Sequence, residues 1–235
     1  MAGRSVELVD RSEMVNTLRA NLVIDPRRTA VVLVDMQRGH LDPPLATMPV
    51  PAAEAARVVE QAAKLLALGR DLDLPIVHLG LVRRRIESEH PNPVQQHFEP
   101  LRQAILGYNV EGTPQAEFMP AVAPRAGEHV ITSKKQLDGF FGTDLEYLLQ
   151  ILGVETLLIG GVNTNTCVLN TCFGAFNRRF KVVVIEECVA SMHGHDLHIF
   201  GLENVRRILG WVLTLEELRE KLGMGAAVGA RGTGA

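Results

Sequence analysis

The sequence lacks blocks of like charge and long apolar runs. Its 235 residues include 24 Lys and Arg and 27 Asp and Glu, which gives a formal net charge of −3 without a basic stripe. Nucleic acid and anionic membrane are therefore not expected as partners. No apolar run approaches the roughly 18 residues that a membrane-spanning helix needs. We expect a packed globular protein, since 46% of the residues are hydrophobic. A small molecule is the partner that we expect instead.

Cysteine is also scarce. The three cysteines, Cys167, Cys172 and Cys188, form no Cys-x-x-Cys pair and have no histidine at zinc-finger spacing. An odd number of thiols, behind an N-terminus without a signal-peptide core, favours a reducing, cytoplasmic location. We expect neither a metal nor another cofactor.

What the chain does contain is an alternation of apolar, β-branched runs with helical patterns. The predicted strands lie at 29–35, 75–80, 129–134, 155–161, 181–187 and 210–214. Helical spacing is found between them, at 52–69, 143–153, 166–179 and 196–208. Repeated β-α units predict an α/β fold: a three-layer, doubly wound and mostly parallel sheet of about six strands, with helices on both faces.

Two stretches interrupt this rhythm. Residues 81 to about 126 are long, polar and rich in proline, which predicts an insertion beside the functional site. The last residues, 223–235, are rich in glycine and alanine, and we expect them to be disordered. The remaining pattern predicts one domain over residues 1–222.

Three chemically active side chains follow predicted strands. Asp35 ends the first strand, Lys134 ends the third, and Cys167 follows the fourth in "GGVNTNTC". Ligands bind at the carboxyl ends of the strands in an open parallel sheet, so these groups are expected to meet there. A helix N-terminus and a nearby lysine favour a thiolate, and a carboxylate can act as general base and then general acid. This combination predicts acyl transfer through a thioester.

Each of these residues also has a structural explanation. Cys167 could be a small buried hydrophobe, Asp35 could cap a turn, and Lys134 could be a solvated lysine at a strand end. Lys135, beside it, suits that solvated position better. The joint arrangement favours a catalytic role for the other three residues.

The segments "TAVVLVDMQRGHLDP", "SKKQLDGFFGTDLEYLLQILGVETLLIGGVNTNTCV" and "VVVIEECVAS" resemble, in order and spacing, the signature blocks of the isochorismatase-like cysteine hydrolases. The resemblance implies that Asp35 is the acid/base carboxylate, Lys134 the catalytic lysine and Cys167 the nucleophile. It also implies a cis peptide bond between Val162 and Asn163. The backbone amides of Asn163 and Cys167 would then form the oxyanion hole.

The cysteine places the resemblance in the amidohydrolase branch of this family, and the likeness is strongest to the ureidoacrylate and ureide type. The implied reaction is hydrolysis of a small carboxamide or ureide C–N bond with release of ammonia. Alternatives are an isochorismatase-type enol-ether hydrolase, a nicotinamidase or a redox-sensing relative without turnover. The resemblance also implies a homo-oligomer, either a dimer or a tetramer.

Substrate contacts are less sharply indicated. Gln37 could orient a substrate amide or serve a turn, and Arg83 could bind a substrate carboxylate or remain a solvated charge. Phe140 and Phe141 could line a pocket or pack in the core. His193, His195 and His198 form a cluster after the fifth strand whose relation to the site stays open.

Overall fold

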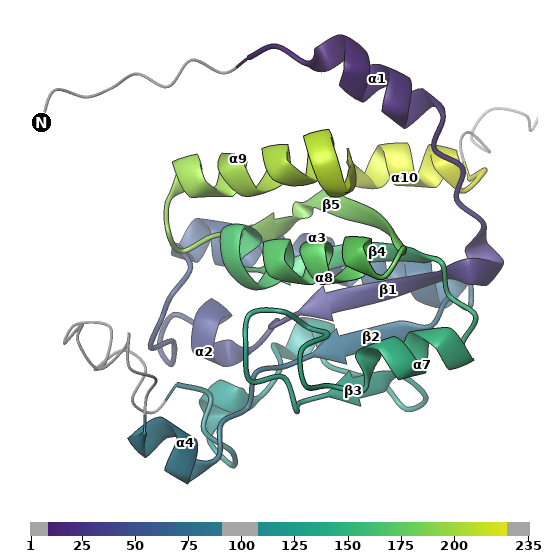
Figure 1. Cartoon of the computed structure of the whole chain (residues 1–235). Helices are drawn as coiled ribbons and strands as arrows, with labels where there is room; N and C mark the ends of the chain where they lie inside the picture. Colours follow the sequence, from purple (N-terminus) through teal and green to yellow (C-terminus); the bar gives the residue numbers. More distant parts are fainter. Residues whose placement is uncertain (1–8, 91–107, 225–235) are drawn as a thin grey trace, which may run out of the picture.

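The computed structural model describes residues 9–90 and 108–224. Six parallel strands form one sheet in the order β3-β2-β1-β4-β5-β6 (Figure 1). The strands are β1 (Thr29–Val34), β2 (Ile76–Leu79), β3 (His129–Ile131), β4 (Thr156–Val162), β5 (Lys181–Ala190) and β6 (Gly210–Leu213). The predicted fold class is confirmed. Most of the tail predicted to be disordered, from 225 onward, lies outside the described residues.

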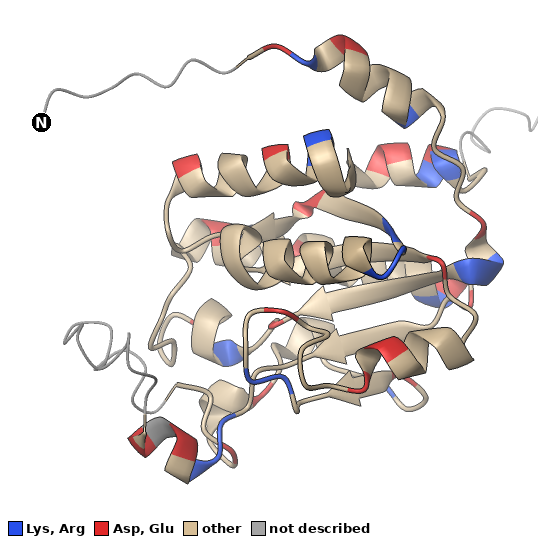
Figure 2. Cartoon of the chain, viewed as in Figure 1, with Lys and Arg blue, Asp and Glu red and all other residues tan. Residues whose placement is uncertain are grey.

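Helices cover both faces of this sheet. The α-helices are α1 (Ser12–Ala20), α2 (Arg38–Leu41), α3 (Ala52–Asp71), α4 (Arg85–Glu89), α7 (Leu145–Ile151), α8 (Leu169–Asn177), α9 (His195–Asn204) and α10 (Leu215–Lys221). Single helical turns are η1 (Pro26–Arg28), η2 (Pro114–Ala116), η3 (Pro120–Val122), η4 (Thr164–Val168) and η5 (Val205–Leu209). Helices and loops carry most of the charged residues, with both signs interspersed (Figure 2). No helix of the described chain is long and apolar enough to cross a membrane.

The core consists of two clusters, one on each face of the sheet. Helices α3 and α10 contribute to one cluster, and α7, α8 and α9 contribute to the other. Strand β1 supplies both, because Val31 and Leu33 point to the first face while Ala30 and Val32 point to the second. All six residues of β1 are buried, which explains why its sequence is a continuous apolar run rather than an alternating one.

The strand order reverses between β1 and β4. From β1 the chain proceeds outward to β2 and β3, then returns to pair β4 with the other side of β1. Ligands of open α/β sheets bind at such a reversal, beyond the carboxyl ends of the strands. Asp35 follows β1 and Cys167 follows β4, so the two residues flank this point.

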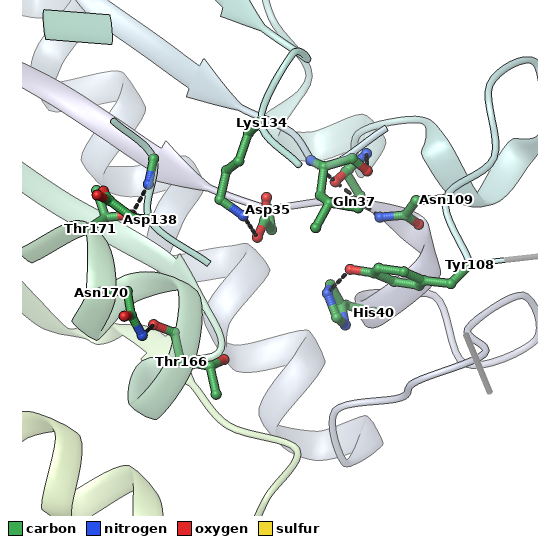
Figure 3. Close-up of polar contacts among 12 residues, drawn as sticks. Asp35, Gln37, His40, Tyr108, Asn109, Lys134, Asp138, Thr166, Asn170 and Thr171 are labelled. Carbon is green, nitrogen blue, oxygen red and sulfur yellow. Dashed lines mark hydrogen bonds and ion pairs between the residues drawn. The ribbon is translucent and has the colours of Figure 1, made fainter. Parts of the chain in front are cut away.

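The third strand is shorter than predicted. It ends at Ile131, and the chain beyond it leaves the sheet and forms an antiparallel bridge between Ser133 and Leu81. Lys134 therefore comes from a loop at the sheet edge rather than from a strand. This departure lets its side chain turn back over β2 toward β1, where Asp35 lies (Figure 3).

Candidate active site

Asp35 sits immediately after β1 in an unusual backbone conformation. Its φ is 52°, in the left-handed region that non-glycine residues seldom occupy, and its side chain is fully buried. Its N–H donates to the Leu79 carbonyl oxygen at 2.9 Å, which continues the ladder between β1 and β2. The turn after β1 therefore keeps the carboxylate inside the protein, and backbone conformations of this kind concentrate at functional sites.

Lys134 is the partner of this carboxylate. Its side chain is fully buried, and Nζ donates to Oδ2 of Asp35 at 2.7 Å (Figure 3). Burial alone would lower the pKa of Lys134, but the negative charge of Asp35 and the neighbouring Cys167 outweigh it, and the pKa is raised. Lys134 is thus an ammonium held inside the protein beside a carboxylate and a thiol.

Cys167 lies in η4, the single turn between β4 and α8, and its side chain is buried. The approach to this turn is tight. Gly161 has a φ of 123°, and a Cβ at that position would lie 2.0 Å from the Val34 carbonyl oxygen, so only glycine fits. The next peptide bond, Val162–Asn163, is cis, as the resemblance implies. The amides of Asn163 and Cys167 thus lie at the start of a helical turn, where N–H groups are available to an oxyanion.

The thiol does not have the lowered pKa that its helical position suggests. Burial and, to a lesser extent, the charge of Asp35 raise the pKa of Cys167 to about 12 against the opposing effect of Lys134. Burial therefore outweighs the preference for a thiolate that the helix start and Lys134 create, and the sequence does not show this burial. Within the described chain, Oδ1 of Asp35 is buried and has no hydrogen-bond partner. The site thus combines a protonated thiol with a carboxylate oxygen that is still able to accept.

Gln37 does not face a substrate. Its Nε2 donates to the carbonyl oxygens of Leu81 and Ala116, at 3.3 and 2.8 Å. Its Oε1 accepts from the N–H of Leu81 at 2.9 Å and from Nδ2 of Asn109 at 3.0 Å (Figure 3). Both amide hydrogens are committed to protein carbonyls, so the side chain fastens Leu81, Asn109 and Ala116 to the end of β1 and has no donor left for a substrate amide.

The other predicted contact residues, Phe140, Phe141 and Arg83, lie in three different environments. Phe140 lies in the core, stacked on Phe180 with a centroid distance of 5.9 Å, so the pocket role expected for it is wrong. Phe141 is exposed to 64%, which corresponds to a surface position. Arg83 is half-buried, and its guanidinium lies over the ring of Tyr108 at 5.8 Å from the centroid. Burial lowers the pKa of Arg83, and none of the described acidic residues forms an ion pair with it.

Two buried residues near Asp35, His40 and Tyr108, were not among the site residues predicted from the sequence. The Tyr108 hydroxyl is hydrogen-bonded to Nε2 of His40, and Nδ1 of His40 lies 3.1 Å from the Met48 carbonyl oxygen. Figure 3 shows the Tyr108 ring reaching inward from the insertion toward the side of the site that holds Asp35. His40 lies five residues after Asp35, whereas no local signal marks Tyr108.

Two of the late histidines contact the turn that carries Cys167. His198 Nδ1 lies 2.8 Å from Oγ1 of Thr164, and His193 Nδ1 lies 3.3 Å from Oδ1 of Asn165. The Ser191 hydroxyl donates to the same Asn165 oxygen at 2.6 Å. The loop after β5 and the start of α9 are thus fastened to the turn that carries Cys167, so the predicted histidine cluster lies near the site without entering it.

Comparison with known proteins agrees with this geometry. The family model described as Isochorismatase domain matches residues 29–217, which include Asp35, Lys134 and Cys167. The chain belongs to the isochorismatase family. The family resemblance found in the sequence is therefore confirmed.

Two curated relatives of this family member are amidohydrolases. A maleamate amidohydrolase of Pseudomonas putida is 33% identical over 198 residues, covering 83% of this chain and 87% of the relative. A ureidoacrylate amidohydrolase of Methylobacterium radiotolerans is 24% identical over 214 residues, covering 86% of this chain and 83% of the relative. Relatives with these activities support amide hydrolysis as the general reaction of this protein.

Solved structures agree on the fold. A cysteine hydrolase from Pseudomonas syringae pv. phaseolicola superposes with a TM-score of 0.73 at 25% identity, covering 86% of this chain and 96% of that one. An N-carbamoylsarcosine amidase from Thermoplasma acidophilum gives 0.64 at 24% identity, with 80% and 96% coverage. The six-stranded parallel sheet is thus the sheet of the isochorismatase-like fold.

Proposed function

We propose that this protein hydrolyses the terminal amide of a small carboxamide or ureide, releasing ammonia through a thioester on Cys167. The observation that carries the proposal is the buried ion pair of Lys134 and Asp35 against the Cys167 thiol. A lysine and an aspartate held inside a protein at 2.7 Å cost desolvation energy, so a site is the natural reason for their presence.

The protonated state of the thiol defines the first step. As the sulfur attacks the amide carbon, its proton passes to Asp35, which has a free acceptor in Oδ1. The amides of Asn163 and Cys167 receive the negative oxygen. Asp35 then returns the proton to the nitrogen, the C–N bond breaks, and ammonia leaves a thioester on Cys167.

Water completes the cycle by the same route in reverse. Asp35 takes a proton from water as the hydroxide adds to the thioester carbon. The C–S bond then breaks, and the departing sulfur recovers its proton from Asp35, which releases the carboxylic acid and restores the starting site. Lys134 stays protonated throughout, since its role is to stabilise the negative charge that moves between Asp35 and Cys167.

We further propose that the substrate carries a carboxylate. The half-buried guanidinium of Arg83 supports this, because no described acidic side chain pairs with it. Maleamate and ureidoacrylate, the substrates in the names of the two relatives, are short planar amides with such a carboxylate. Replacing Arg83 by methionine is expected to raise KM for these anions about 10- to 100-fold. Turnover of a neutral amide of similar size, such as acrylamide, should be unchanged.

The proposal is tested by incubating the purified protein with maleamate, ureidoacrylate, biuret, carbamoylsarcosine and nicotinamide and measuring ammonia. We expect release from at least one of the anionic amides, and a loss of at least about 10³-fold in Cys167→Ala. Incubation with isochorismate and measurement of released pyruvate test the alternative, an enol-ether hydrolase. Pyruvate release without ammonia from any amide would overturn the proposed reaction, and full activity of Cys167→Ala would overturn the nucleophile.

A further inference from the structure

The buried pair of His40 and Tyr108 has no place in the mechanism above, yet it faces the reacting groups. Tyr108 is exposed to only 4%, and Asp35 and Cys167 both lie near enough to affect the pKa of its hydroxyl. Its ring is tilted against that of His40, with centroids 4.9 Å apart. A buried tyrosine needs a partner for its hydroxyl, and the identity of that partner determines which way the O–H bond points.

The protons of this pair can be assigned from their neighbours. A carbonyl oxygen only accepts, so Nδ1 of His40, at 3.1 Å from the Met48 oxygen, must carry a hydrogen. Burial lowers the pKa of His40, so the ring is neutral and its Nε2 is an acceptor. The Tyr108 hydroxyl therefore donates its only proton to Nε2 of His40.

This assignment leaves the phenolic oxygen with lone pairs alone toward the site. Burial raises the pKa of Tyr108, so the phenol keeps the proton that it donates to His40. On the Asp35 side the site thus presents two kinds of acceptor, the Tyr108 oxygen and the free Oδ1 of Asp35. The amides of Asn163 and Cys167 are proposed above to bind the substrate oxygen, and we place the substrate nitrogen beside these acceptors.

We propose that Tyr108 is a specificity-determining residue that accepts a hydrogen bond from the –NH₂ group of the substrate, and that His40 is the positioning residue that holds its hydroxyl in the acceptor orientation. The inference rests on the proposed amide hydrolysis. An amide nitrogen offers two hydrogens, whereas an ester oxygen at the same position offers only lone pairs, which the Tyr108 oxygen repels. The product acid, once ionised, is disfavoured for the same reason. The pair thus selects amides over esters and favours product release.

The test compares an amide with its methyl ester, because both yield the same acid and the same thioester. For maleamate and monomethyl maleate, maleate formation is measured by chromatography as kcat and KM for each substrate. In Tyr108→Phe, kcat/KM for the amide is expected to fall about 10- to 100-fold, while that for the ester stays the same or rises. Tyr147→Phe is the matched control, since Tyr147 is the other tyrosine of the chain and is 68% exposed on α7. It should change neither value.

The role of His40 is tested with Tyr108 left in place. His40→Leu removes the acceptor and frees the hydroxyl proton to point into the site, so the amide-to-ester ratio is expected to fall at least about tenfold. The double variant should show the same ratio as Tyr108→Phe alone, because the two residues act as one unit. Thermal unfolding of each variant verifies the fold, and Tyr108→Phe alone suffices if His40→Leu does not fold.

The outcomes separate this inference from the reaction itself. Parallel losses for amide and ester in Tyr108→Phe, or an unchanged ratio in both single variants, would overturn the inference and leave the amidase intact. A wild-type protein that releases ammonia from none of the amides would overturn the proposed function, and the role of Tyr108 with it.

Discussion

Two carboxylates, the fully buried Asp35 and the largely buried Glu128, show how differently this protein uses the same chemical group. Glu128 accepts from Arg70 through both oxygens, at 2.7 and 3.2 Å, and from Nε2 of His78 and the N–H of Arg125. Asp35 accepts from Lys134 through one oxygen, and its other oxygen has no partner among the described residues. Glu128, whose two oxygens both have hydrogen-bond partners, stabilises the fold. Asp35 keeps one oxygen that is able to accept a proton.

The two sites also differ in which group has a shifted pKa. Burial would raise the pKa of Glu128, but the hydrogen bonds from Arg70, Arg125 and His78 outweigh it and hold the pKa at about 2. Such a group cannot serve as a base near neutral pH, because it does not bind a proton there. At the other site the perturbed group is the thiol of Cys167, whose pKa of about 12 means that its proton must be removed during the reaction. This contrast can be tested by four variants or measurements.

The largest effect is expected from Asp35→Asn. Asparagine has nearly the same shape but cannot accept the thiol proton, so kcat should fall at least about 10³-fold. Ammonia release from the preferred amide measures this loss. Asp42→Asn is the matched control on the next turn, where Asp42 pairs with Arg38, and it should stay within about threefold of wild type. Similar activity of the two variants would remove Asp35 from the mechanism.

Lys134→Met is expected to damage both activity and stability. It leaves Asp35 as an unpaired buried charge, which should lower the free energy of unfolding by about 3 kcal/mol. Urea unfolding measures the change. Adding Asp35→Asn to this variant should recover most of the stability, because no buried charge then remains. If the double variant were less stable than Lys134→Met, the ion pair would not be the cause of the loss.

Alkylation of Cys167 measures the raised pKa of the thiol directly. A pKa of about 12, against an ordinary value near 8.5, leaves about one thiol in 10⁴ ionised at pH 8. Inactivation by iodoacetamide is therefore expected to be at least about 100-fold slower than alkylation of free cysteine, and to accelerate as the pH rises toward 10. Burial also raises the pKa values of Cys172 and Cys188, so neither should compete for the reagent. Inactivation as fast as free cysteine would indicate a resting thiolate.

Glu128→Gln is expected to affect stability alone. The loss of charge-assisted hydrogen bonds should lower the free energy of unfolding by about 2 kcal/mol at pH 7, with activity within about threefold of wild type.

The pH dependence of this contribution follows from the lowered pKa. The stabilisation by Glu128 is present above its unfolded pKa of about 4.3 and is lost as the pH falls toward about 2. Burial also lowers the pKa of His78, so its contribution begins to fall below about pH 6.5. Urea unfolding at pH 7, 4 and 3 should show a shallower acid decline in Glu128→Gln than in wild type. Equal declines would contradict the assignment.

Local patterns were sufficient to predict the sheet and the convergence of Asp35, Lys134 and Cys167 at one edge of it. Strand β1 is buried on both faces, so its apolar run is continuous, and Asp35 marks its end. The conformation of the segment Gly160–Cys167 depends on its own residues, since only a glycine fits at position 161 against the Val34 backbone. These features depend on residues close in sequence or on the regular geometry of a parallel sheet, which any β-α pattern shares.

The same local patterns could not predict contacts between segments that are distant in the sequence. Gln37 binds Asn109 across 72 positions, and His40 binds Tyr108 across 68. Phe140 was a candidate for lining the pocket, yet it turns into the core against Phe180. Pairings of this kind depend on how loops fold back, for which neither periodicity nor spacing carries a signal.

By itself, the sequence determined the fold class, the family and the meeting of Asp35, Lys134 and Cys167 at one sheet edge, because strand ends and helix starts are encoded locally. Only the tertiary structure decided the protonation of the site. Burial raises the pKa of Cys167, the partner count distinguishes Asp35 from Glu128, and Met48 determines which His40 nitrogen accepts from Tyr108. Protonation depends on desolvation and on neighbours from several segments, which exist only after the chain has folded.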